Sequence, residues 1–301
     1  MDQTLLDEMF NSILFKHKGV YLQRDLSTPE NVDSIEHMEI RDSDVFLVTY
    51  PKSGTIWTQN ILCQILKEKQ GKVEDNVDNM AKAPWIECNL YNIDFGSCLS
   101  PRLFTSHLPY YLMPKDLRNQ RGKVIYVSRN PKDVVVSFYY FHKLIVKYHN
   151  TAITWEAFFD RYVAGKVFVG SWFDHVRGWY THKEEFNCLL LSYEEMIKDL
   201  RSAVLKICQF VDVKLDDQAV KRIVEKATFK NMKQDPLANY TFISKEILDY
   251  SKGDFLRKGI IGDWKNMMTV AQSERMDEVL KEKLGDLPIT FIWDMNEETE
   301  S

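Results

Sequence analysis

The chain has 301 residues, of which 45% are hydrophobic and 28% are charged, so it is long enough to bury a large core. Its 39 basic and 44 acidic residues give a net charge of −5, which excludes a general electrostatic attraction to nucleic acid or to an anionic membrane. Any anion must therefore be bound by a local site. No linker-like stretch, fixed-period repeat or low-complexity segment divides the sequence, so we expect one domain over residues 1–301 with a core from about 40 to 290.

The ends and the cysteines of the chain predict a reduced, cytoplasmic protein. Residues 1–8 are acidic where a secretory signal would be basic, and no apolar run is long enough to cross a bilayer. The five cysteines are odd in number and form no C-x-x-C pair that would suggest zinc or redox chemistry. They are Cys63, Cys88, Cys98, Cys188 and Cys208.

A strand, a loop and a helix form the first predicted unit. The apolar run 45–50 lies between charged residues and Pro51, which is typical of a buried strand. Apolar residues from Ile56 to Leu66 then recur at helical spacing, so a helix should follow a short turn.

The same unit is predicted again further along the chain. A strand at 124–128 precedes Asn130, which suits a helix N-cap, and Pro131, which suits the first helical position of a helix running to about Tyr148. Strands alternating with helices predict an α/β domain with a central parallel sheet flanked by helices, whose ligands bind at the carboxyl ends of the strands. Further strands are expected at 103–106 and 188–192, and further helices over 154–165, 171–184, 201–211, 216–227 and 270–283.

The loop 51–55, P-K-S-G-T, predicts an anion site. It connects a buried strand to a helix, so backbone N–H groups and the helix dipole can converge on a phosphate. Lys52 precedes Gly54, whereas a Walker A loop places its lysine after the last glycine, so the ATPase interpretation is weakened. An ordinary turn with a surface lysine remains an alternative for this segment taken alone.

Three separated motifs together resemble the cytosolic sulfotransferase family. Residues 49–57, T-Y-P-K-S-G-T-I-W, resemble its 5′-phosphosulfate loop, and residues 129–137, R-N-P-K-D-V-V-V-S, resemble its 3′-phosphate segment. Residues 257–265 resemble its C-terminal signature R-K-G-x-x-G-D-W-K. The resemblance implies a P-loop-like sulfotransferase fold and the donor 3′-phosphoadenosine 5′-phosphosulfate (PAPS), with PAP as product and no metal. It also implies sulfation of a small phenol, alcohol, steroid or amine, as in conjugation of xenobiotics or hormones.

The donor has two anionic ends, and the three motifs supply a cradle for each. Taken singly, Arg129 could be a surface ion-pair residue and each aromatic a plain core residue. Many relatives have Ser or Thr where Ala227 stands, so Thr228 is a candidate to replace a lost hydrogen bond to the base. By resemblance, the donor contacts are Lys52, Ser53, Gly54, Thr55, Ile56, Trp57, Arg129, Ser137, Tyr193, Ala227, Thr228, Phe229, Met232, Leu256, Arg257, Lys258 and Gly259.

Transfer to a hydroxyl or amine needs a general base, and His107 is the candidate. It follows a predicted strand in the context T-S-H-L-P, which matches the catalytic histidine of the family, although six other histidines compete. By resemblance, Lys52 stabilises the leaving group and Ser137 restrains Lys52 until the acceptor arrives.

The acceptor site should be lined by aromatic side chains. Segment 138–145 contains no carboxylate, so a cationic acceptor would need Glu87 or Asp94 as its counter-charge. Each aromatic could equally fill the core. The resemblance places Tyr21, Trp85, His107, Phe141 and Tyr240 near the acceptor.

Residues Lys265 to Glu274 fit the K-x-x-x-T-V-x-x-x-E dimer motif of the family, which implies a homodimer. Without the resemblance, this segment is a helix start with Thr269 as its N-cap, and both interpretations can hold. Two other functions stay open from the residues alone. One is a P-loop nucleotide kinase, which the loop spacing disfavours, and the other is a nucleotide-binding scaffold in which His107 is merely structural.

Overall fold

The computed structural model describes residues 3–70, 77–88 and 90–295. A four-stranded parallel sheet forms its centre, in the order β4-β3-β5-β6. The strands are β3 (Val45–Thr49), β4 (Leu103–Ser106), β5 (Lys123–Ser128) and β6 (Cys188–Ser192). The predicted α/β domain with a parallel sheet flanked by helices is confirmed.

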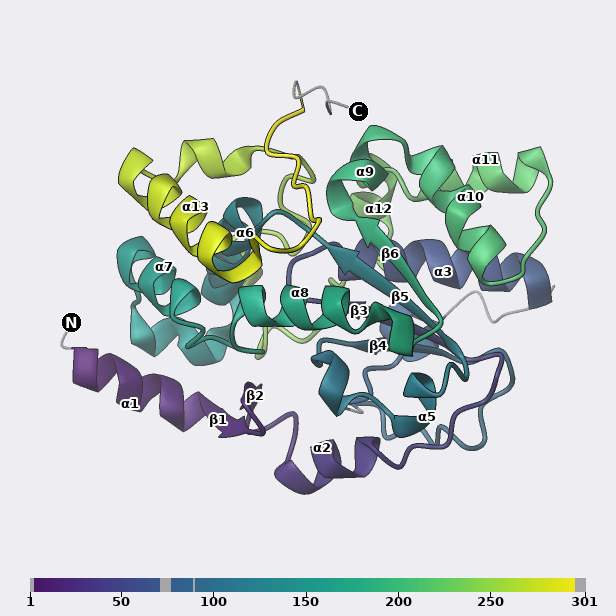
Figure 1. Cartoon of the computed structure of the whole chain (residues 1–301), viewed down its shortest axis with the longest axis horizontal. Helices are drawn as coiled ribbons and strands as arrows, with labels where there is room; N and C mark the ends of the chain where they lie inside the picture. The colour runs from purple at the N-terminus through teal and green to yellow at the C-terminus, as the bar shows by residue number, and fades with distance from the viewer. Residues whose placement is uncertain (1–2, 71–76, 89, 296–301) are drawn as a thin grey trace.

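Strand β3 reads as an unbroken apolar run because both of its faces are buried. Val45 and Leu47 pack in one cluster with α3 (Thr55–Gln70), α10 (Leu200–Phe210) and α11 (Asp217–Lys226). Phe46 and Val48 face the opposite side, where they pack in a second cluster with Trp179. Figure 1 shows α3, α10 and α11 together on one side of the sheet.

Four helices, including the one that follows β5, form a third packed unit. These helices are α6 (Pro131–Leu144), α7 (Trp155–Val163), α8 (Trp172–Thr181) and α13 (Val270–Leu284), and their buried side chains share one cluster. Figure 1 shows α6, α7 and α13 on the side of the sheet away from α10 and α11. This unit buries the start of α6, which places the residues of its first two turns next to the edge of the sheet.

Helix α6 begins as the sequence predicts but ends earlier. The Asn130 side chain accepts the Asp133 N–H at 2.8 Å, and Pro131 occupies the first turn. The helix was expected to reach Tyr148, yet it ends at Leu144. Ile145 is extended and pairs with Leu248, since this distant segment offers backbone partners that helical periodicity cannot reveal.

Several elements were not predicted, most of them because they are short and their apolar patterns are brief. They are α1 (Gln3–Ile13), the hairpin β1 (Leu14–His17) and β2 (Val20–Gln23), α2 (Pro29–Ile35), α4 (Asn79–Lys82), α5 (Lys115–Arg118), α9 (Tyr193–Lys198) and α12 (Phe229–Gln234). Within the described ranges, we find no helix with the length and apolar character needed to cross a membrane.

Candidate functional site

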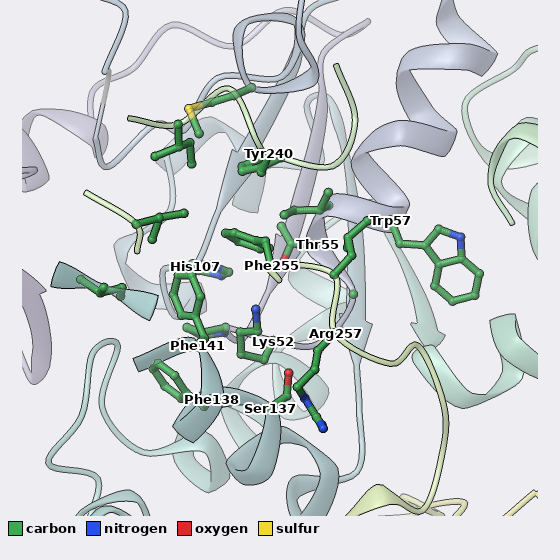
Figure 2. A pocket seen from close by; sticks show the side chains of 18 of the residues that line it. Lys52, Thr55, Trp57, His107, Ser137, Phe138, Phe141, Tyr240, Phe255 and Arg257 are labelled. Carbon is green, nitrogen blue, oxygen red and sulfur yellow. The ribbon is translucent and has the colours of Figure 1, made fainter. Parts of the chain in front are cut away.

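Four segments meet at one edge of the sheet because parallel strands end there together. Lys52 follows β3, His107 follows β4, Arg129 follows β5 and Tyr193 follows β6. All four line a cavity of ≈570 Å³, shown in part in Figure 2. Distant parts of the chain, including Arg257, complete its wall.

The loop between β3 and α3 has a backbone that only an unusual sequence accommodates. Lys52 and Gly54 both have positive φ, 69° and 96°. A Cβ on Gly54 would lie 2.8 Å from the Tyr193 ring, so glycine permits this close approach. The first N–H groups of a 16-residue helix have no partner within the helix, and Thr55 and Ile56 line the cavity where α3 begins. The loop therefore presents an anion site to the cavity.

Arg129 closes one side of this site. Its guanidinium donates to the carbonyls of Lys52 and Ile260, both at 3.1 Å, and lies 4.1 Å from the centre of the Tyr193 ring. Its Nε is buried and has no hydrogen-bond partner among the described atoms. A buried donor without a partner is costly, so this nitrogen is suited to an anionic ligand.

Arg257 and Lys258 bring two more cations to the same end of the cavity. Both bind the carboxylate of Asp263 at 2.5 Å, to its two different oxygens. The Arg257 Nε is a second buried donor that lacks a partner within the described part of the chain. Together with Arg129, these residues fit a phosphate group.

A flat slot lies beside the cations. The rings of Trp57 and Tyr193 meet edge to face with centroids 5.4 Å apart, and the Trp57 indole donates to the Ala227 carbonyl at 2.7 Å. A Cβ on Gly259 would lie 2.3 Å from the Phe229 ring, so this glycine is needed for the contact. Phe229 and Met232 line the cavity here, and the arrangement fits a planar aromatic base.

Three of the predicted donor contacts do not line the cavity. Ser53 and Ala227 are fully buried. The Thr228 hydroxyl donates to the Glu225 carbonyl at 2.8 Å. The other predicted donor contacts all line the cavity: Lys52, Gly54, Thr55, Ile56, Trp57, Arg129, Ser137, Tyr193, Phe229, Met232, Leu256, Arg257, Lys258 and Gly259.

His107 is held in one tautomer by the end of β3. Its Nδ1 lies 2.7 Å from the Thr49 carbonyl, which can only accept, so Nδ1 carries the proton and Nε2 keeps a free lone pair. Burial is the main cause that lowers the pKa of His107 to about 3. The imidazole is therefore neutral near pH 7 and able to accept a proton.

Glu87 holds the backbone of His107 in place, a role that no local pattern of residues predicts. Its Oε1 accepts the His107 N–H at 2.7 Å, and burial raises the pKa of this carboxyl to about 7. Glu87 lines the cavity, whereas Asp94, the other acid considered as a counter-charge, accepts the Gly96 N–H and lies outside the lining.

Lys52 lies inside the cavity, and none of the acidic residues that the structure describes pairs with it. Burial, followed by the nearby charges of Arg129 and Arg257, lowers its pKa to about 7. Its Nζ lies 4.2 Å from the centre of the Phe141 ring and 4.3 Å from that of Phe255. No hydrogen bond links it to Ser137, which also lines the cavity. Phe255 is not among the predicted site residues, although it immediately precedes the predicted donor contacts at 256–259.

The opposite end of the cavity is mainly aromatic. Three of the residues predicted to contact the acceptor line this end: Trp85, Phe141 and Tyr240. The Tyr240 hydroxyl donates to Gln59 Oε1 at 2.6 Å. Tyr21 does not line the cavity, and its ring lies under the Lys16 ammonium instead. Among the residues with a described position, no three His, Cys, Asp or Glu side chains cluster to hold a metal.

The predicted dimer segment lies on the surface at the start of α13. Thr269 caps this helix, since its side chain accepts the Gln272 N–H and the Gln272 side chain accepts the Thr269 N–H in return. Val270, within this segment, is 75% exposed.

Comparison with known proteins gives one consistent result. A family model described as "Sulfotransferase domain" matches residues 42–288. The chain is 48% identical over 290 residues to the amine sulfotransferase of Oryctolagus cuniculus, covering 96% of both chains. It is 40% identical over 294 residues to sulfotransferase 2B1 of Rattus norvegicus, covering 97% of this chain and 86% of the relative. A crystal structure of a mouse sulfotransferase complexed with PAP is 30% identical with a TM-score of 0.73, covering 91% of this chain and 95% of that one.

Proposed function

The chain belongs to the sulfotransferase family, and we propose that it moves the sulfuryl group of PAPS to a hydroxyl or amine of a small, mostly apolar acceptor. The observation that carries this proposal is the shared cavity, in which a neutral histidine and a buried lysine line one space with a cationic end and an aromatic end. The crystallised relative that binds PAP supports the identity of the donor.

The donor fits the cationic end of the cavity. The 3′-phosphate would be held by Arg129, Arg257 and Lys258. The Nε atoms of the two arginines are buried and have no hydrogen-bond partner among the described residues, so they can donate to the phosphate. The adenine would lie in the slot between Trp57 and Phe229. Ser137 lines the wall between the two ends, so we assign it a contact to the donor as well.

The donor supplies an electrophilic sulfur whose bond to the 5′-phosphate oxygen breaks during transfer. His107 Nε2 takes the acceptor proton as the acceptor oxygen or nitrogen bonds to sulfur. Lys52 stabilises the negative charge that collects on the departing phosphate oxygen. The products are the sulfated acceptor, PAP and one proton, so the charges and atoms balance without a further reactant.

The acceptor class is proposed more broadly than the donor. Trp85, Phe141 and Tyr240 would contact an aromatic or alicyclic body beside His107. One relative is named an amine sulfotransferase, which supports an amine, while phenols, alcohols and steroids fit the same apolar wall. We retain Tyr21 as an acceptor contact only for a molecule that extends beyond the cavity.

We further propose that residues 1–301 form one sulfotransferase domain, that it dimerises through Lys265–Glu274, and that it works in the cytoplasm. The exposed Val270 supports the dimer contact. The five cysteines are all unpaired, which supports a reducing compartment.

Purified protein incubated with sulfur-labelled PAPS and a mixed panel of phenols, alcohols, steroids and amines tests the main proposal. We expect label on at least one acceptor and release of PAP. PAP binding without transfer to any acceptor would instead favour a nucleotide-binding scaffold. Phosphate transfer from ATP would favour a kinase.

A further inference from the structure

The Lys52 ammonium is held between two aromatic rings. Nζ lies 4.2 Å from the centre of the Phe141 ring and 4.3 Å from that of Phe255, while the two rings are 5.0 Å apart and inclined by 60°. Figure 2 shows the Lys52 side chain beside these two rings. Phe141 comes from α6 and Phe255 from the segment before Arg257, so the rings reach the lysine from distant parts of the chain.

These rings are the favourable partners that the described residues offer to this charge. Lys52 makes no ion pair and no side-chain hydrogen bond with the described residues. The charged groups that act on it are Arg129, after β5, and Arg257, in the C-terminal segment, and both disfavour its ammonium form. His107, after β4, is neutral, Lys258 is engaged by Asp263, and the nearby part of α6 contributes the uncharged Ser137 and Phe141.

We propose that Phe141 and Phe255 form an aromatic clamp that positions the Lys52 ammonium and keeps it charged, with Phe255 as a positioning residue for sulfuryl transfer. The role of Lys52 in transfer rests on the proposed function, whereas the clamp itself rests on the ring contacts. A ring face attracts a cation through its quadrupole and adds no net negative charge. A carboxylate in the same place would neutralise Lys52 and repel the departing phosphate oxygen.

Phe255 also connects the lysine to both substrate regions. Its ring lies 5.2 Å from that of Tyr240, which lines the aromatic end of the cavity. Two residues further along the chain is Arg257, whose guanidinium lies at the cationic end. A change in either region can therefore reach Lys52 through one side chain.

The direct test measures the pKa of the Lys52 side chain by NMR in protein labelled at the lysine ε-carbons, with Lys52→Met to assign its signal. In the free protein we expect a value of about 7, lowered chiefly by burial. Phe255→Leu keeps a similar apolar volume but removes the ring, so the pKa should fall by about 0.5 to 1 unit. Phe255→Tyr keeps the ring face and should leave the pKa unchanged.

Phe242→Leu is the matched control, because Phe242 lines the same cavity and packs against Tyr240 with ring centres 5.1 Å apart, whereas the rings beside Lys52 Nζ are those of Phe141 and Phe255. The Lys52 pKa should not move in this variant. Phe141→Leu removes the second ring and should lower the pKa as Phe255→Leu does, which keeps the test open if one variant folds poorly.

The kinetic test follows kcat against pH. Lys52 acts when protonated, so kcat should fall as the pH rises through its pKa in the donor complex. Phe255→Leu should move this alkaline fall to lower pH by about 0.5 to 1 unit, and Phe255→Tyr should restore it. A Phe255→Leu protein with the Lys52 pKa of the parent would overturn the clamp. If the parent sulfates no acceptor, the proposed function fails, while the NMR result still decides the clamp.

Discussion

His107 shows how a backbone carbonyl can prepare a side chain for catalysis. The Thr49 carbonyl fixes the proton on Nδ1, and burial keeps the ring neutral by lowering its pKa to about 3. His107→Ala should lower kcat by about 10²- to 10⁴-fold, because the acceptor then loses its general base. Labelled-sulfate transfer measures this loss, and calorimetry with PAP should give an unchanged affinity.

His149→Ala is the control for this variant, since His149 is partly exposed, its Nε2 donates to the Lys143 carbonyl at 3.0 Å, and it lies outside the cavity lining. The pH profile adds a second check. With a pKa of about 3, His107 in the free protein is already deprotonated at pH 5, so protonation of His107 should cause no acid-side fall in kcat/KM for the donor between pH 5 and 7. Undiminished turnover in His107→Ala would remove the base assignment.

Arg257 should distinguish two nucleotides that differ in one phosphate. Its buried Nε and its place beside Lys258 suit a 3′-phosphate. Arg257→Ala should weaken PAP by about 10- to 100-fold, the range for losing charge-assisted hydrogen bonds, and should weaken adenosine 5′-phosphosulfate much less. Calorimetry measures both affinities.

Arg222→Ala serves as the matched arginine control, because this side chain is exposed and pairs with Glu68 away from the cavity. Its affinity for both nucleotides should equal that of the parent. Equal losses for the two nucleotides in Arg257→Ala would contradict the 3′-phosphate assignment.

At the scale of elements, the cap of α6 supports more than one helix. Asn130 accepts the Asp133 N–H at 2.8 Å and donates to the buried Glu194 at 3.0 Å, so it ties α6 to α9. Asn130→Ala should lower the free energy of unfolding by about 1–2 kcal/mol through the lost cap, with more lost at Glu194. Chemical denaturation measures the change.

Thr154→Ala is the comparison for this cap. Thr154 also caps a helix, α7, but it makes a single long bond of 3.3 Å to the Ala157 N–H at an exposed site. We expect a smaller loss of unfolding free energy there. A loss in Asn130→Ala no greater than in Thr154→Ala would show that the bond to Glu194 adds nothing.

The long elements could be predicted because their patterns are local. The apolar run 45–50 predicts a buried strand, and the Asn130-Pro131 pair predicts a helix start. Each pattern spans only a few residues, and the structure confirms both. The early end of α6 could not be predicted, since it depends on the pairing of Ile145 with Leu248, about 100 residues away. Short helices such as α9 and α12 carry too few apolar residues to show a period.

The same limit applies to the site. The strand-end positions of Lys52, His107 and Arg129 follow from the order of elements, which the sequence reveals. The contact of Phe255 with Lys52 and that of Glu87 with the His107 backbone depend on side-chain placement across the cavity. No local pattern encodes such contacts.

At the scale of the whole molecule, the predicted dimer can be separated from catalysis. Val270 is 75% exposed at the start of α13, outside the cavity lining. Val270→Glu should turn the proposed dimer into a monomer, because it places a charge in a small apolar contact. Sedimentation velocity measures the assembly, and kcat per chain should stay within about twofold because Val270 lies outside the cavity lining.

Leu99→Glu is the control, since Leu99 is an equally apolar side chain that is 87% exposed outside the dimer segment. It should leave the assembly unchanged. A parent protein that sediments as a monomer, or a Val270→Glu protein that stays dimeric, would refute the dimer contact.

The two ends of the cavity at the carboxyl edge of the sheet are built from different parts of the chain. Its cationic end is built from strand ends, the start of α3 and the 257–259 segment, while much of its aromatic end comes from other connecting segments, such as those that carry Trp85 and Tyr240. Substitutions in these segments can exchange one acceptor for another and leave the donor end intact. Duplicated copies of such a gene would diverge in the compounds they sulfate while inheriting the same sulfate source.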